Sequence, residues 1–139
     1  MRTIVSIIIH CTATPAGRNV TVGEIRQWHR DRGRADIGYH YGIGLDGTVH
    51  EGRPIDKMGA HCTGQNAHSV GICYVGGTDK NGTPCDTRTD AQKAAMLRLV
   101  KVLMETYDIK ADHVWGHNRF AAKACPSFDV EQWKKEVGL

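Results

Sequence analysis

The feature that most constrains this chain is the apolar segment from Ile4 to Ile9, which is rich in β-branched residues and ends at a polar residue, His10. An apolar run of this length is typical of a strand covered on both faces, as in the middle of a parallel sheet. Such a sheet needs helices packed against it. We therefore expect an α/β fold in which this segment is the central strand and presents His10 at its carboxyl end.

Three helices are predicted. Thr21 with Glu24, and Thr89 with Gln92, form the capping-box pattern that marks the start of a helix. Apolar residues then recur at helical spacing in both segments, at Ile25 and Trp28 in the first and at Met96, Val100, Leu103 and Tyr107 in the second. A last helix is expected to begin near Asp129.

Four further strands are predicted, over residues 39–45, 48–51, 70–75 and 113–116. The first two flank Asp46-Gly47, a dipeptide that predicts a hairpin with a two-residue turn. The resulting order of elements is β, α, β, β, β, α, β, α. It predicts a central mixed sheet flanked by helices.

Length and charge fit one domain spanning residues 1–139, since no linker, repeat or low-complexity segment divides the chain. The net charge of +3 is dispersed and gives no support for nucleic-acid binding. No apolar run is long enough for a membrane helix, and the N-terminal segment lacks a signal-peptide cleavage site. We expect a monomer that is made in the cytoplasm and does not insert into membranes, with its five cysteines reduced.

Three residues could bind a metal ion. His10 and His117 each follow an apolar strand, and in open α/β sheets ligands gather at the carboxyl ends of strands. Pro126 favours extended backbone at Cys125, so Lys123, two residues earlier, is expected to project to the same side and to favour a thiolate. Two histidines and one cysteine would leave the fourth position of a zinc ion open, as catalytic sites do.

Spacing alone leaves other interpretations open. Histidines at strand ends are commonly solvated loop residues, and a lone cysteine such as Cys125 is commonly an inert buried thiol. Cys125 could instead be a nucleophile paired with His10 or His117. A purely structural zinc is disfavoured, because such sites normally have four protein ligands.

A resemblance covering nearly the whole chain favours the zinc site. It is carried, in this order, by IIIHCTAT, IRQWHRDRG, DIGYHYGIGLDGTVHEGR, GAHCTGQNAHSVGICYVGG and GHNRFAAKACPSFD. These segments resemble the N-acetylmuramoyl-L-alanine amidase family, which includes phage amidase-type lysozymes and animal peptidoglycan recognition proteins. The resemblance implies their α/β fold, one Zn²⁺ per chain, and hydrolysis of the amide between the muramic acid lactyl group and L-alanine in peptidoglycan.

The resemblance also implies roles for individual residues. The zinc ligands of the family correspond to His10, His117 and Cys125. Its two catalytic residues correspond to Tyr39, which would relay a proton or hydrogen-bond the attacking water, and Lys123, which would stabilise the oxyanion. Its substrate groove corresponds in part to His61 and Asn66. The remaining histidines are expected to be structural: His29, His40, His50, His68 and His113.

Gln65 stands where many relatives have Tyr, so the resemblance does not extend to the peptide contacts at that position. The phage branch implies an endolysin that reaches the cell wall after release from the cytoplasm, and some phage relatives also bind a polymerase. The alternative function is a peptidoglycan-binding module without activity, as in relatives that replace the metal-binding cysteine. Because Cys125 is present, we expect cleavage.

Overall fold

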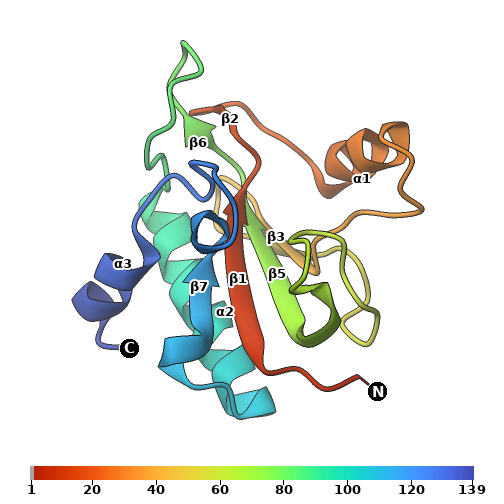
Figure 1. Cartoon of the computed structure of the whole chain (residues 1–139). Helices are drawn as coiled ribbons and strands as arrows, with labels where there is room; N and C mark the ends of the chain where they lie inside the picture. The colour runs from red at the N-terminus through yellow and green to blue at the C-terminus, as the bar shows by residue number, and fades with distance from the viewer. Residues whose placement is uncertain (1) are drawn as a thin grey trace.

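A computed structural model describes residues 2–139 and shows a five-stranded sheet with helices packed around it (Figure 1). The strand order is β4-β3-β5-β1-β7. The strands span Ser6–Cys11 (β1), Tyr41–Ile43 (β3), Val49–Glu51 (β4), Ser69–Tyr74 (β5) and Val114–Gly116 (β7). All pairings are parallel except that of β3 with β4. The mixed sheet is as predicted, and β1 is an interior strand between β5 and β7, with β5 in the middle of the sheet.

The three predicted helices are present as α1 (Val22–Asp31), α2 (Asp90–Tyr107) and α3 (Val130–Val137). Both capping boxes form, and Asp129 caps α3. Two short strands that the sequence did not suggest, β2 (Thr14–Pro15) and β6 (Gly77–Thr78), make a separate parallel pair. Short 3-10 turns occupy Asn66–His68 (η1), Ala111–His113 (η2) and His117–Arg119 (η3).

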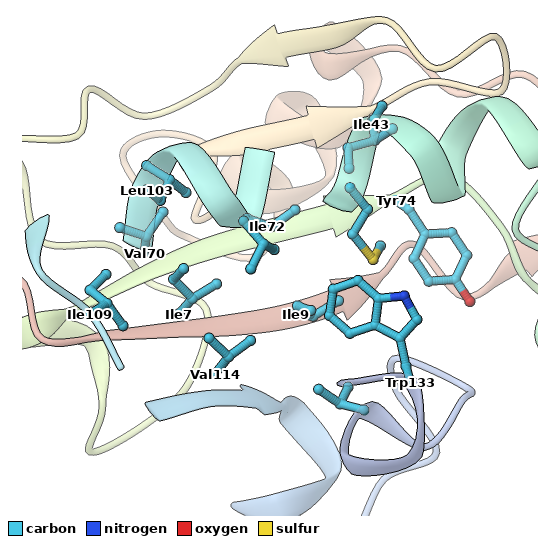
Figure 2. Close-up of a cluster of buried hydrophobic side chains, with 14 of the residues drawn as sticks. Ile7, Ile9, Ile43, Val70, Ile72, Tyr74, Leu103, Ile109, Val114 and Trp133 are labelled. Carbon is cyan, nitrogen blue, oxygen red and sulfur yellow. The ribbon is translucent and has the colours of Figure 1, made fainter. Parts of the chain in front are cut away.

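The main core lies between α2 and one face of the sheet (Figure 2). Ile7 and Ile9 of β1 contribute to it together with Val70 and Ile72 of β5. Since side chains alternate between the two faces of a strand, His10 of β1 projects to the opposite face of the sheet from α2. The core therefore fixes one face of β1 and leaves the other face for the functional site.

A smaller apolar cluster joins α1 to the loop before β3. Its buried members are Val20, Ile25, Ile37 and Val75, and the partly buried Trp28 and Tyr39 pack against them. This cluster holds Tyr39 next to the functional face of the sheet.

Two local predictions were wrong. The hairpin between β3 and β4 has a three-residue connection: Gly47 N donates to Gly44 O and Gly44 N donates to Thr48 O, at 2.9 Å each. Gly47 has φ of +85°, which suits the left-handed position of such a turn. His10 lies within its strand instead of following it, because the parallel pairing of β1 with β5 continues to Cys11 opposite Tyr74.

Candidate metal centre and active site

His10, His117 and Cys125 converge on one point although they are far apart in sequence. Their possible ligand atoms all lie within 4.8 Å of one another. His10 comes from β1, His117 from the turn directly after β7, and Cys125 from the loop before α3. The neighbouring parallel strands β1 and β7 end at the same edge of the sheet, which explains why the two histidines meet.

The one separation between ligand atoms that is known individually suits two ligands of a zinc ion. His10 Nδ1 lies 3.8 Å from Cys125 Sγ. Bond lengths of about 2.05 Å to nitrogen and 2.3 Å to sulfur place two tetrahedral ligands roughly 3.6 Å apart. Two imidazoles and a thiol are also the donor set that zinc prefers. With three protein ligands, a fourth position would remain for water or substrate.

The loop that carries Cys125 is fixed by hydrogen bonds at both ends of the Cys125-Pro126 unit. Cys11 N donates to Cys125 Sγ at 3.2 Å, and the buried Tyr74 hydroxyl donates to Pro126 O at 2.7 Å. Ser127 N donates to Ala124 O, so the chain turns at Cys125-Pro126, and the peptide bond between these two residues is cis.

The electrostatics of the site keep its histidines neutral. Burial, with a smaller contribution from His61, holds the pKa of His10 well below its usual range. Burial and the charge of Lys123 lower the pKa of His117. Contact with the Cys11 thiol and burial raise the pKa of Cys125. The imidazole lone pairs are thus available for a metal, whereas binding at the sulfur must release a proton.

Tyr39 lies beside the three ligands. Its ring centroid is 5.0 Å from that of His10, and it belongs to the cluster around α1 described above. Burial raises the pKa of its hydroxyl well above the usual range, with a further contribution from nearby cysteines. The phenol is therefore protonated at neutral pH and can donate a hydrogen bond.

Lys123 lies two residues before Cys125 in the same loop. Its side chain is exposed. After burial, its charge contributes to the lowered pKa of His117, and it contributes less to that of His10. An exposed cation near a neutral ligand set can meet negative charge that develops on a bound substrate.

His61 and Asn66 lie close to the ligands but are occupied by protein contacts. The buried His61 ring meets His10 Nε2 through Nδ1 at 2.8 Å and Ser69 Oγ through Nε2 at 3.2 Å. Asn66 Oδ1 accepts hydrogen bonds from His61 N and Cys62 N, both at 2.9 Å. Contact of these two residues with substrate stays a prediction, and the structure shows them organising the loop over β5.

Sequence reasoning missed the part played by Ser69, Gly71 and Cys11. In β5 the small residues Ser69 and Gly71 alternate with large apolar ones, and they face the site while the large residues face α2. A Cβ atom on Gly71 would lie 2.7 Å from the His61 ring. This alternation of small and large residues was the available signal that one face of β5 lies under a functional loop.

Other histidines have the structural environments expected of them. His29 Nδ1 accepts from Gly38 N at 2.7 Å, and His40 Nδ1 accepts from Gly71 N at 3.0 Å. Burial lowers the pKa of each to about 4. Both rings are neutral supports around the site.

An open depression of about 520 Å³ adjoins the metal-binding segments. It is lined by Asn118 and Arg119 after His117 and by Ala124 and Ser127 on either side of Cys125, and it extends to the start of α3. None of the three ligands lines this depression. Within residues 2–139, no helix is long and apolar enough to cross a membrane.

Comparison with known proteins agrees with this geometry. Residues 1–128 match the family model of N-acetylmuramoyl-L-alanine amidase. The chain is 45% identical to the endolysin of Enterobacteria phage K11 over 127 residues, covering 91% of this chain and 83% of that one. It is 42% identical to the endolysin of Escherichia phage T7 over 128 residues, covering 92% and 83%.

Solved structures show the same fold. The N-acetylmuramoyl-L-alanine amidase LysC from Clostridium intestinale URNW superimposes with a TM-score of 0.84 at 29% identity, covering 99% of this chain and 87% of that one. The bumblebee peptidoglycan recognition protein PGRP-SA gives 0.78 at 30% identity, covering 97% and 82%. Since the family model matches nearly the whole chain, and the residues that converge at the end of β1 lie inside that match, this protein belongs to the N-acetylmuramoyl-L-alanine amidase family.

Proposed function

We propose that this protein is a zinc-dependent endolysin that hydrolyses the amide between the lactyl group of muramic acid and L-alanine in peptidoglycan. The observation that carries the proposal is the convergence of His10, His117 and Cys125 at one open position. The phage endolysins to which the chain is similar support the cell-wall substrate.

The three side chains would hold one Zn²⁺ per chain. When bound, the ion would supply Lewis acidity, which activates water near neutral pH and polarises an amide carbonyl. The neutral imidazoles of His10 and His117 suit this role because they need lose no proton to bind. The alternative in which Cys125 is a nucleophile needs no metal, so the response to a chelator distinguishes it from the zinc enzyme.

Lys123 would stabilise the negative charge that develops on the lactyl carbonyl oxygen. Its exposed ammonium group can move toward a substrate seated over the ligands, and its field already reaches both histidines. Donors of this kind contribute about 10²- to 10³-fold to rate.

Tyr39 would donate a hydrogen bond to the attacking water or to the carbonyl oxygen. Its protonated hydroxyl and its position against His10 support this role over that of a phenolate base. A residue held on one side by the α1 cluster can keep such a donor in a fixed direction.

As an endolysin, the protein would act as a monomer on the cell wall after its release from the cytoplasm. The proposed partner is peptidoglycan. Its glycan chains could lie in the depression beside Asn118 and Ala124.

The decisive test is digestion of purified peptidoglycan followed by mass spectrometry of the soluble products. The expected products are free stem peptides with an N-terminal L-alanine and glycan with intact lactyl groups. Activity should disappear with a chelator and return with added zinc. Full activity in metal-free protein would contradict the zinc proposal, and binding of the wall without product would identify a recognition module instead.

A further inference from the structure

We propose that a buried chain of hydrogen bonds fixes the His10 ring in the tautomer that presents Nδ1 to the metal. This relay runs from the main-chain carbonyl of Gln65 through Ser69 and His61 to His10. His61 and Ser69 are then positioning residues for the first zinc ligand. The inference deepens the proposed function and rests on its zinc site.

The direction of each hydrogen bond follows from the far end of the relay. The Gln65 carbonyl oxygen can only accept, so the Ser69 hydroxyl, 2.7 Å away, donates its single proton there. Ser69 Oγ must therefore accept from His61 Nε2, at 3.2 Å. With its proton on Nε2, a neutral His61 ring has a bare Nδ1.

The same reasoning assigns the proton on His10. His61 Nδ1 lies 2.8 Å from His10 Nε2 and must accept, so His10 carries its proton on Nε2. Nδ1 of His10 is then unprotonated. That atom is the one that faces Cys125 Sγ, at 3.8 Å, on the side where the ligand atoms converge.

The rings of His10 and His61 are both neutral. His10 is fully buried and His61 is 7% exposed. Within residues 2–139, the hydrogen-bond partners of the two rings include no carboxylate that would stabilise a positive charge. A neutral pair has one proton per ring, which the relay places on Nε2 in each case.

The fold reserves the position of the His61 ring. The ring lies directly over Gly71 of β5, where any Cβ atom would collide with it at 2.7 Å. The loop behind the ring is tied by Asn66 Oδ1, which accepts from the amides of His61 and Cys62. Since both ring nitrogens are occupied, His61 has no free nitrogen to offer a substrate.

Zinc affinity tests the relay directly. Partners that orient a metal-binding histidine typically contribute 10- to 100-fold to affinity. We expect Ser69→Ala to weaken zinc binding about tenfold or more, as measured by competition with a chromogenic chelator, because His61 loses the group that fixes its proton. Ser6→Ala is the matched control. Ser6 lies opposite Ser69 in the β1–β5 register, is also buried, and makes no hydrogen bond to the relay within residues 2–139.

A second readout needs no metal. Ring nitrogen chemical shifts in the metal-free protein should show His10 with its proton on Nε2 in the wild type and in Ser6→Ala. In Ser69→Ala the two tautomers should mix. A His10 ring protonated on Nδ1 in the wild type would overturn the proposal, whether or not the protein binds zinc.

The remaining outcomes separate this proposal from the proposed function. Failure of the wild type to bind zinc refutes the zinc site, while the tautomer measurement still decides the relay. If Ser69→Ala and His61→Ala both bind zinc as tightly as the wild type, the relay is refuted and the zinc site is not. In particular, a raised KM at saturating zinc in His61→Ala, with unchanged zinc affinity, would assign His61 to substrate contact instead.

Discussion

The backbone amide of Cys11 donates a hydrogen bond of 3.2 Å to the sulfur of Cys125, across 114 residues of sequence. Strand β1 thus supplies both a ligand, His10, and, through the next residue, a donor to a second ligand. A hydrogen bond to a sulfur becomes stronger when the sulfur is ionised. The contact therefore favours the state of Cys125 that binds metal and keeps its loop against β1.

Cys125→Ser should abolish stable zinc binding, and with it amidase activity, because the hydroxyl is a far weaker zinc ligand than a thiolate. Metal analysis of the purified variant and digestion of peptidoglycan measure the two losses. Cys11→Ala is the control, since it retains the backbone amide that contacts Cys125. It should bind zinc, and a zinc-free Cys11→Ala protein would mean that the Cys11 thiol itself holds the site together.

Lys123→Ala should keep its zinc and lose about 10²- to 10³-fold in kcat, as expected for an oxyanion donor. Lys80→Ala, at an exposed position in the loop after β6, should leave kcat unchanged. Steady-state kinetics on a soluble muramoyl peptide, with zinc content measured in parallel, provide the comparison. Loss of zinc in Lys123→Ala would show that this residue supports the metal site and not the chemistry.

Tyr39→Phe removes only the hydroxyl and preserves the packing against His10 and α1. It should reduce kcat by about 10²-fold through loss of one fixed donor, with zinc content unchanged. Because the phenol is protonated throughout the neutral range, the residual activity should follow the same pH profile as the wild type. A profile that loses one of its limbs would instead make Tyr39 a proton-transfer group.

Much of this fold could be predicted because its signals are local. The capping boxes at Thr21 and Thr89 act within four residues, and both formed as predicted. The Ile4–Ile9 run identified an interior strand because five of its six residues are apolar and β-branched, as burial on both faces favours. The three-residue turn at Gly47 was harder to predict from sequence. Its length depends on how β3 pairs with β4 and on how closely α2 approaches Gly47.

The site could be predicted only in part, for a related reason. His10, His117 and Cys125 were identified by residue type, strand ends and resemblance, and the structure brings them together. The relay through Ser69 depends on which residue of β5 lies opposite which residue of β1, and that register is a property of the assembled sheet. The turn at Cys125 depends on Tyr74, which is 51 residues earlier and reaches it only through the folded core.

Stability should fall on acidification because His29 and His40 are buried as neutral rings. Burial lowers the pKa of each to about 4, whereas an unfolded histidine titrates near about 6.5. Below about pH 6.5 the unfolded state binds more protons than the folded state. The contribution of each neutral ring to the free energy of unfolding is therefore fully present above about pH 6.5. It declines toward pH 4, by at most about 1.4 kcal/mol per pH unit for each ring.

Urea unfolding at pH 7, 6 and 5 measures this decline. His40→Gln should show a shallower dependence on pH than the wild type, because one of the rings that must remain neutral is gone. His113→Gln, at an exposed position, is the control and should retain the wild-type slope. Equal slopes in wild type and His40→Gln would contradict the assignment.

Tyr74→Phe should weaken both the fold and the metal site. The Tyr74 hydroxyl is buried and donates to Pro126 O at 2.7 Å, so its removal leaves a buried carbonyl without that donor and costs about 1–3 kcal/mol of unfolding free energy. Since Pro126 follows Cys125 directly, the loop should also hold the sulfur of Cys125 less firmly, and zinc affinity should fall.

Tyr107→Phe is the matched control, because within residues 2–139 that hydroxyl makes no side-chain hydrogen bond. Urea unfolding and zinc competition on both variants decide the matter: a stability loss in Tyr74→Phe with unchanged zinc affinity would show that the cysteine loop is held by Cys11 alone.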